Sequence, residues 1–386
     1  MFTKTSLTGG IVGLANVGKS TFFQAITKSN LGNPANYPFA TIDPEEARVS
    51  VPSPRLDTLS EICKPNKVIP TQLTVFDIAG LVKGASKGDG LGNAFLSNIR
   101  AVNGLIQMVR VFDDHEIDHI EKTVNPVRDA QIVQDEPILK DMEIVLGTID
   151  HLSNRKQRSK ENDVVLAVCN KIIKVLDEGK KANTIDESEW KDSDYKHLRK
   201  LNLLTMKPSV YVANISEEDY CFGDPNALVA DLKQWIQHEN SFNKNKNMLP
   251  EIVPVSVNFE SRLSKLSPEE QMMELKTLES KSALPQVMTT LRRALGLQSF
   301  FTVGKQEVRE WTVLKGSTPV HAAGVIHEDL AKTFITASVI NYDTYVENEG
   351  NESALKRLGK VMAKGKDYIL QDGDILHIHS AGARKK

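Results

Sequence analysis

The chain is poor in cysteine, in net charge and in long apolar runs. Its 386 residues include three cysteines, Cys63, Cys169 and Cys221, which lie far apart and in no metal-like spacing. This usage indicates free thiols in a reducing compartment and argues against a disulfide framework. The formal net charge is −2, so binding to nucleic acid would need a local basic patch. No apolar run approaches membrane-spanning length, and we expect no membrane partner.

The composition is otherwise that of a globular protein, with 40% hydrophobic and 25% charged residues. The length is enough for two or three domains. Few residues precede the first predicted strand, so we expect no ordinary signal peptide and a cytoplasmic location. We also expect a monomer. The alternative is a very short organelle address opened by Phe2, Lys4 and Leu7, which leaves mitochondria open.

One stretch organises the chain. Residues 13–20 read GLANVGKS, the Gly-x-x-x-x-Gly-Lys-Ser pattern of a phosphate-binding loop. Apolar residues at 11–12 predict a strand before it, and the apolar spacing from Phe22 predicts a helix after it. We expect Lys19 to reach the β- and γ-phosphates and the Ser20 hydroxyl to ligate Mg²⁺. The loop residues expected at the nucleotide are Asn16, Val17, Gly18, Lys19, Ser20 and Thr21.

Two later segments match the switch regions of P-loop proteins. The span 33–44 contains three prolines and predicts an exposed loop. Thr41 within it is expected to close on Mg²⁺ and the γ-phosphate; the alternative is an ordinary turn threonine. Residues 73–80 predict a buried strand ending in Asp-x-x-Gly. Asp77 is expected to hold Mg²⁺ through water, and Gly80 to offer its N–H to the γ-phosphate.

The residue after this glycine bears on hydrolysis. Many GTPases place a water-orienting glutamine there, whereas this chain has Leu81, which cannot hydrogen-bond water. Hydrolysis is therefore expected to be slow, to use another group, or to await a partner. The loop at 80–92 carries five glycines. Ordering it costs much entropy, so it suits a segment that is fixed only by the γ-phosphate or a partner.

A third motif concerns the base. GTPases normally carry Asn-Lys-x-Asp, whose aspartate accepts the ring N–H and the exocyclic amine of guanine, but residues 214–217 read NISE. Ile215 replaces the lysine, and Glu217 carries its carboxylate one methylene further out. Adenine has an unprotonated nitrogen where guanine has N–H, so a displaced carboxylate removes a repulsion. We predict that ATP is preferred, the alternative being that this motif still reads guanine weakly. The predicted base-binding residues are Asn214, Ile215, Glu217 and Ser256.

Alternating strands and helices predict an α/β fold with a mostly parallel, doubly wound sheet and the ligand at the strands' carboxyl ends. This nucleotide domain is predicted to be discontinuous, over residues 1–125 and 208–299. Helical apolar spacing predicts an antiparallel hairpin or short coiled coil over 126–207. We expect its first helix to begin at Pro137. The basic run at 154–160 either touches RNA phosphates or is a solvated loop.

The last segment, residues 300–386, changes composition and predicts a small mixed β domain. The expected strands are 310–313, 324–327, 337–340, 367–370 and 374–378, around one helix near 329–336.

Together these residues resemble the YchF/Obg-like ATPase family, within the Obg-related translation-associated P-loop proteins. The resemblance spans nearly the whole chain, and the Asn-x-x-Glu variant separates this family from its GTP-reading relatives. The stretches that carry it are 13–21, 36–44, 77–85, 90–93, 214–217 and 322–327.

The resemblance implies a central P-loop domain, an inserted coiled-coil arm and a C-terminal TGS domain of β-grasp shape. It implies binding and hydrolysis of ATP in preference to GTP, and association with the ribosome or its RNA through the arm and the TGS domain. The cofactor implied is Mg²⁺, held by Ser20, Thr41 and Asp77. Asn16 matches an asparagine that ligates K⁺ in related proteins.

The implied catalytic residues are Lys19, Thr41, Gly80 and His119. His119 matches a histidine proposed to help hydrolysis, and His115 is its local competitor. Two function classes stay open: an ATPase switch, and a ribosome- or RNA-binding adaptor in which the nucleotide is mainly structural. A switch that prefers GTP is the third alternative.

Overall fold

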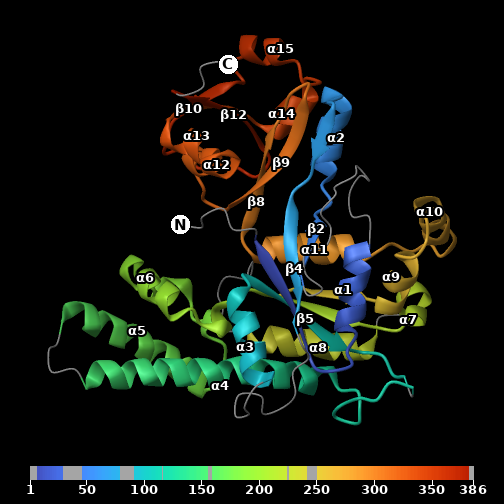
Figure 1. Cartoon of the computed structure of the whole chain (residues 1–386), viewed down its shortest axis with the longest axis vertical. Helices are drawn as coiled ribbons and strands as arrows, with labels where there is room; N and C mark the ends of the chain where they lie inside the picture. The colour runs from blue at the N-terminus through green and yellow to red at the C-terminus, as the bar shows by residue number, and fades with distance from the viewer. Residues whose placement is uncertain are drawn as a thin grey trace.

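The structure, a computed structural model, describes residues 7–28, 46–78, 91–114, 116–154, 159–223, 226–240 and 250–381. The predictions for Thr41, Gly80, Leu81 and His115 concern residues outside these ranges. Figure 1 shows a central sheet with its helices, a helical arm extending to one side, and a second sheet above. No helix in the described ranges is both long enough and apolar enough to span a bilayer.

The central sheet has six strands in the order β2-β4-β1-β5-β6-β7. Every neighbouring pair is parallel except β2 and β4, which run antiparallel. The inner strands are buried along almost their whole length, as is usual for a parallel sheet covered on both faces. This confirms the predicted α/β fold. The strands are β1 (Thr8–Val12), β2 (Glu46–Ser50), β4 (Gln72–Asp77), β5 (Gly104–Arg110), β6 (Ser209–Asn214) and β7 (Ile252–Val255).

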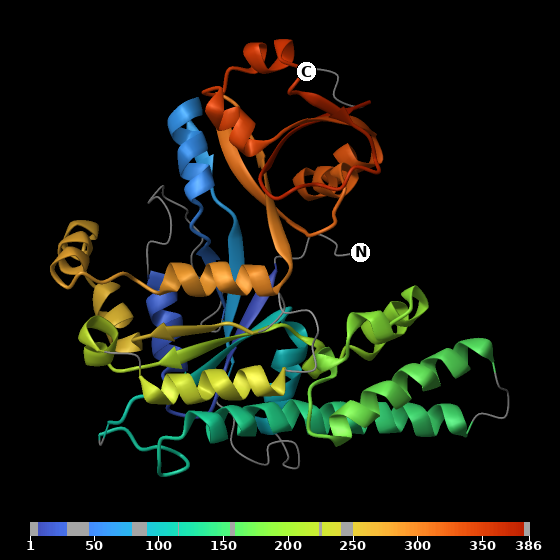
Figure 2. The same cartoon turned by 180° about the vertical axis from the view of Figure 1, so that it is seen from behind.

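Helices cover both faces of this sheet (Figure 2). Apolar side chains of α11 pack against one face in the main core, while α8 and the start of α4 cover the other. Local sequence sets several helix starts, because Ser256 caps α9 and Ser267 with Glu270 forms a capping box on α10. The helices are α1 (Lys19–Lys28), α3 (Leu91–Ala101), α7 (Glu217–Phe222), α8 (Ala227–Glu239), α9 (Val257–Leu263), α10 (Pro268–Thr277) and α11 (Leu284–Ala294).

The arm is built on two antiparallel helices, as predicted, but holds more than a hairpin. Helix α6 and three 3₁₀ turns follow and complete a separate apolar core. Cys169 and Ile172 of the second helix are fully buried in that core. The arm elements are α4 (Pro126–Ser153), α5 (Lys160–Asp177), η1 (Ala182–Thr184), η2 (Glu187–Glu189), α6 (Asp192–Leu201) and η3 (Leu204–Met206).

The predicted start of the first arm helix at Pro137 is wrong. Helix α4 begins at Pro126, where the side chain of Asn125 accepts a hydrogen bond from the N–H of Arg128. Pro137 lies inside the helix and is buried. A proline there removes one backbone hydrogen bond, the one to the carbonyl of Val133. The burial of apolar groups on both sides of Pro137 outweighs that local loss.

The second sheet has the order β11-β10-β12-β8-β9-β3 and mixes parallel with antiparallel pairs. Helices α12 and α13 pack against one face, and α2, α14 and α15 against the other. The elements are β3 (Lys67–Ile69), β8 (Leu297–Thr302), β9 (Glu307–Leu314), β10 (Phe334–Ile340), β11 (Met362–Lys364), β12 (Asp374–Ser380), α2 (Pro54–Cys63), α12 (Pro319–Ile326), α13 (Glu328–Lys332), α14 (Tyr342–Glu347) and α15 (Glu352–Arg357).

Three details predicted for this region are wrong. Residues 324–326 end helix α12 instead of forming a strand, because Pro319 starts a helix there that buries Ala322 and Ala323. Residues 367–370 are not a strand. The helix predicted over 329–336 stops at Lys332, and the β-branched run that follows belongs to β10.

The second sheet also recruits a segment from early in the chain. Strand β3 pairs with β9 at the sheet edge, and α2 buries Leu56 and Leu59 against Phe301 and Val308. The Thr71 and Thr312 hydroxyls lie 2.6 Å apart beside this junction. Because α2 and β3 lie between β2 and β4 in sequence, the chain passes between the two sheets three times: from β2 to α2, from β3 to β4, and from α11 to β8 (Figure 1).

Candidate functional site

Five strand ends meet at one edge of the central sheet. Gly13 follows β1, Asp77 ends β4, Arg110 ends β5, Asn214 ends β6 and Ser256 follows β7. The register places Ile11 beside Asp77, Arg110 beside Asn214 and Asn214 beside Val255. This carboxyl edge is where open α/β sheets bind ligands, and it brings together most of the predicted site residues that the structure describes.

The phosphate loop needs glycine at two positions for steric reasons. A Cβ on Gly13 would lie 2.4 Å from the carbonyl oxygen of Met108. Gly18 has φ +99°, and a Cβ there would lie 2.7 Å from the Asn214 amide nitrogen. Any larger residue would therefore move the loop away from β5 or β6. The glycines keep the backbone N–H groups close together at the start of α1, which is the arrangement that binds phosphate.

Lys19 is the first residue of α1 and is 7% exposed. Its Nζ donates a hydrogen bond of 2.6 Å to the carbonyl oxygen of Leu14. Burial lowers the pKa of Lys19 to about 8, and the negative charge of Asp77 partly offsets this. A phosphate group would supply a strong acceptor and negative charge, both of which favour the charged ammonium.

Asp77 carries a buried oxygen that needs a partner. Among the residues that the structure describes, none donates a hydrogen bond to its Oδ1. A buried unpaired carboxylate oxygen is costly unless an ion or water satisfies it. Ser20 and Thr21 are exposed at the start of α1, so their hydroxyls are open to a ligand. A hard cation such as Mg²⁺, bound through oxygen atoms and water, fits this donor set.

Asn214 fixes the geometry of the loop. Its Nδ2 donates to the carbonyl oxygen of Val17 (3.0 Å), and its Oδ1 accepts from the N–H of Val257 (3.1 Å). The side chain thus ties the phosphate loop to the start of α9. The next residue, Ile215, is buried beneath the edge. Ser256 is fully buried, and its hydroxyl caps α9 by accepting from Phe259 N–H.

Glu217 opens helix α7 and is paired. Its Oε1 lies 2.5 Å from the Nη2 of Arg262 on α9, and the Nη1 of the same guanidinium lies 2.5 Å from Glu274 on α10. About two fifths of the Glu217 side chain is exposed. No local sequence signal points to Arg262 as the partner of Glu217, because the two residues are 45 positions apart.

Asn16 and His119 are brought near each other by a backbone contact. The Asn16 amide donates to the carbonyl oxygen of Asp118 (3.2 Å), and Asn16 has φ +61°. The His119 side chain is buried: its Nε2 lies 2.9 Å from Asp129 and its Nδ1 accepts from the N–H of Glu121. Both ring nitrogens are therefore occupied by protein groups in this conformation.

Arg110 is a site-forming residue that sequence reasoning missed. It is 1% exposed, and its guanidinium donates to the carbonyl oxygens of Phe112, Asp114 and Ile117. These three bonds fold the loop that places His119. The available signal was a single charged side chain at 110 inside an apolar strand pattern.

The remaining predicted site residues, Thr41 and Gly80, lie outside the described residues. Within the described ranges no group of three or more His, Cys, Asp or Glu side chains is placed to hold a metal. A metal at this edge would thus depend on hydroxyl groups, water and phosphate oxygens together with Asp77.

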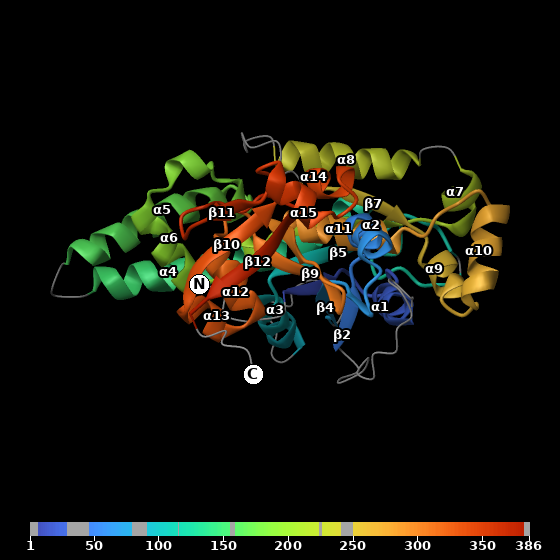
Figure 3. The ribbon, with the colours of Figure 1, turned by 90° about the horizontal axis from the view of Figure 1, so that it is seen from above.

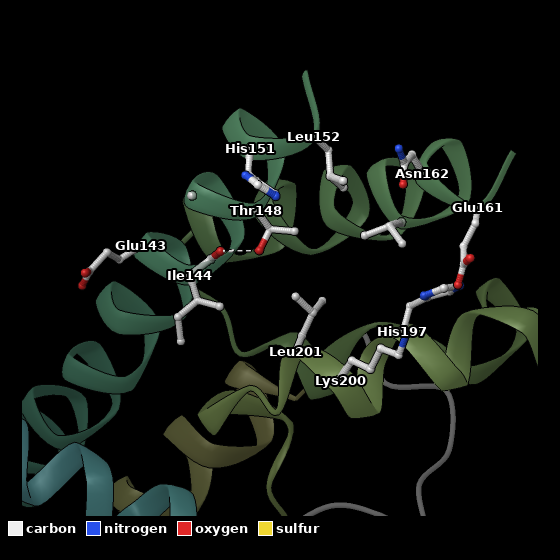
Figure 4. A pocket seen from close by; sticks show the side chains of 12 residues that line it. Glu143, Ile144, Thr148, His151, Leu152, Glu161, Asn162, His197, Lys200 and Leu201 are labelled. Atoms are coloured by element: carbon white, nitrogen blue, oxygen red, sulfur yellow. Dashed lines mark hydrogen bonds between the residues drawn. The ribbon is translucent and has the colours of Figure 1, made fainter. Parts of the chain in front are cut away.

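A separate cavity of about 640 Å³ opens in the arm (Figure 4). Helices α4, α5 and α6 line it with both apolar and polar side chains, including Leu152, His151 and His197. Its position on the arm separates it from the nucleotide edge, and it takes no part in the site described above.

Two family models match the chain. One described as a 50S ribosome-binding GTPase matches residues 8–146. The other, named for the C-terminal part of YchF GTPases and described as a protein of unknown function, matches residues 297–381.

Full-length relatives match as well. Obg-like ATPase 1 of Saccharomyces cerevisiae is 49% identical over 391 residues, covering 98% of this chain and 95% of that protein. Human Obg-like ATPase 1 is 42% identical over 378 residues, covering 96% and 92%. The solved structure of the Schizosaccharomyces pombe YchF GTPase superposes with a TM-score of 0.84 at 43% identity, covering 97% of this chain and 98% of that one.

The identity, the coverage and the superposition agree with the carboxyl-edge geometry described above. The chain belongs to the YchF/Obg-like ATPase family of P-loop nucleotide-binding proteins.

Proposed function

We propose that this protein binds ATP in preference to GTP and hydrolyses it slowly, as a switch that acts in translation. The observation that carries the proposal is the phosphate loop with Lys19 buried at the start of α1 beside the unpaired oxygen of Asp77. Backbone amides, a lysine and a carboxylate at one sheet edge are the parts that P-loop proteins use to bind a nucleoside triphosphate with its metal.

The preference for adenine rests on the base end of the site. Ile215 is buried and apolar where GTP-reading proteins have lysine, and the acid at 217 is a glutamate that pairs with Arg262. Neither feature favours the guanine edge, whose donors need free acceptors. Relatives carry both names, Obg-like ATPase 1 and YchF GTPase, so the test below measures both nucleotides.

Mg²⁺ is the proposed cofactor, with Ser20, Thr41 and Asp77 as its protein ligands; it would neutralise charge on the phosphates. Asn16 is the proposed K⁺ ligand. Lys19, Thr41 and Gly80 are proposed to stabilise the transferring phosphate. A catalytic role for His119 requires that it first leaves Asp129, since both of its ring nitrogens are in use.

Ribosomal RNA is the proposed partner, reached through the arm and a TGS-type C-terminal domain, in the cytoplasm. The family model described as a 50S ribosome-binding GTPase supports this. We propose a monomer with a nucleotide domain at 1–125 and 208–299, an arm at 126–207 and a C-terminal domain at 300–386, to which α2 and β3 add a strand and core residues.

A second candidate function is an adaptor in which the nucleotide is a structural ligand. The occupied ring of His119 favours it, and so does Leu81 in place of glutamine. The two candidates differ in turnover: a switch is stimulated by ribosomes or K⁺, whereas an adaptor is not.

The test measures affinity for ATP and GTP and turnover of each, in Na⁺ and in K⁺, with and without ribosomes. Lys19→Ala is expected to lower ATP affinity by about 100-fold, because it removes a charge-assisted contact to phosphate. Lys28→Ala, at the exposed end of the same helix, is the matched control. Full turnover by Lys19→Ala, or tight GTP binding without ATP binding, would overturn the proposal.

A further inference from the structure

The base end of the site contains an arginine that no sequence motif includes. Helix α7 begins at Glu217, directly after β6, and α9 begins directly after β7. Because these two strands are parallel neighbours, both helices start at the edge that carries the phosphate loop. Figure 3 shows α7, α9 and α10 grouped at the end of the molecule opposite the arm.

Arg262 joins all three helices. One terminal nitrogen pairs with Glu217 of α7 and the other with Glu274 of α10, each at 2.5 Å. The guanidinium carbon lies 5.4 Å from the ring centroid of Phe259 on its own helix. The side-chain amide of Gln271 on α10 donates to two carbonyl oxygens, one on the last residue of α9 and one three residues further along the chain. The guanidinium is thus held in place by contacts on several sides.

This pairing changes what the Glu217 carboxylate can do for a base. To read guanine, a carboxylate must offer acceptor oxygens to two donors, the ring N–H and the exocyclic amine. An oxygen that already accepts from Arg262 is less available for that purpose. Against adenine, a free carboxylate faces a ring nitrogen lone pair and repels it, and a neighbouring guanidinium screens that repulsion.

We propose that Arg262 is a positioning residue that sets the base selectivity of this site by holding and neutralising the Glu217 carboxylate. This inference rests on the proposed function, since it assumes that the purine lies beside the start of α7. It adds that the glutamate alone does not set the preference: without Arg262, Glu217 turns to the base and favours guanine.

The rival explanation is that Arg262 only ties α10 to the body of the protein. The two explanations differ for Glu274→Gln, which removes the tie to α10 and leaves the pair with Glu217. Our inference expects the ratio of the GTP and ATP dissociation constants to remain unchanged in this variant. If Arg262 only ties α10 to the body of the protein, Glu274→Gln should change that ratio as much as a substitution of Arg262 does.

The experiment measures that ratio for the full chain by competition against a fluorescent nucleotide. Arg262→Gln is expected to shift the ratio toward GTP by roughly tenfold, since a recovered pair of base contacts discriminates strongly. In a Glu217→Gln background the same change should have less than about a twofold effect, because the group it acts through is gone. Arg293→Gln, which breaks an exposed ion pair with Glu251, is the matched control and should leave the ratio unchanged.

An unchanged ratio in Arg262→Gln, or an equal shift in the Glu217→Gln background, overturns this inference while leaving ATP binding intact. Wild-type protein that binds neither nucleotide overturns the proposed function as well. Thermal unfolding of each variant accompanies the titrations, so that a loss of affinity for both nucleotides through misfolding is separated from a change in their ratio.

Discussion

Lys19 is held at the start of α1 with its ammonium group on the carbonyl oxygen of Leu14, and burial lowers its pKa from 10.5 to about 8. In the folded, nucleotide-free protein this group is therefore half deprotonated near pH 8, whereas in the unfolded chain it reaches that point only at about pH 10.5. Below pH 8 the fold bears the full cost of burying the charge. That cost is relieved as the pH rises from 8 to 10.5, so this group makes the fold more stable across that window.

Binding of a triphosphate reverses the shift, because it places negative charge beside the ammonium. At pH 8 we expect uptake of about half a proton for each nucleotide bound, since about half of Lys19 is neutral beforehand. Titration calorimetry in two buffers of different ionisation enthalpy measures this uptake. It should be close to zero at pH 7, and a binding enthalpy that does not depend on the buffer at pH 8 would contradict the assignment.

His119 gives a second prediction at this scale. Its buried ring links Asp129 to the backbone of Glu121, so His119→Ala should lower the free energy of unfolding by about 1–3 kcal/mol. His238→Ala, at a side chain that is 83% exposed, should change it by less than about 0.5 kcal/mol. Chemical denaturation measures both. Equal stability of the two variants would show that the buried pair adds nothing to the fold.

The residues of the site differ in how far sequence alone could place them. The phosphate loop was predictable because its chemistry is local: glycines, lysine and serine at fixed spacing. Asn214 could be predicted as a site residue from the motif at 214–217, but its role as a clamp between Val17 and Val257 could not. The pair of Glu217 with Arg262 and that of His119 with Asp129 depend on how separate helices pack, and no spacing rule reports that.

Among the elements, α2 departs most from the expected organisation. Leu59 on this helix is fully buried against residues of the C-terminal sheet. Leu59→Ala should lower the free energy of unfolding by about 2–5 kcal/mol, the usual range for a buried leucine. Glu61→Ala, exposed on the same helix, is the control. A destabilisation below about 1 kcal/mol would mean that α2 detaches easily from this sheet.

Element types followed their patterns where the pattern was long and failed where it was short. Strand β4 and helix α1 were predicted because a buried apolar run and helical spacing each extend over several residues. The short run at 324–327 was misread as a strand, because periodicity cannot distinguish a buried helical turn from a buried strand. At Pro137 the local rule that proline starts or breaks a helix was wrong, because packing of α4 keeps the helix continuous through this residue.

At the scale of the whole molecule, the residues after 296 do not make up the complete C-terminal sheet. Its edge strand β3 and part of its core come from the segment between β2 and β4. A fragment of residues 297–386 should therefore expose apolar side chains such as Phe301 and Val308 and an unpaired edge on β9. We expect it to aggregate.

A fragment that carries residues 54–71 joined through a flexible linker to residue 297 should remain soluble and monomeric, because it restores both α2 and β3. Size-exclusion chromatography with light scattering compares the two fragments. If the shorter fragment is as soluble and monomeric as the longer one, residues 54–71 are dispensable for this sheet.

The position of β3 also determines where a mechanical load would travel. A domain attached through a single linker can rotate without disturbing its neighbour, but the C-terminal sheet is attached at three points: from β2 to α2, from β3 to β4, and from α11 to β8. Strand β4 ends in Asp77. A partner that binds the C-terminal sheet and rotates it would therefore also displace β4, the strand that carries Asp77 to the phosphate loop.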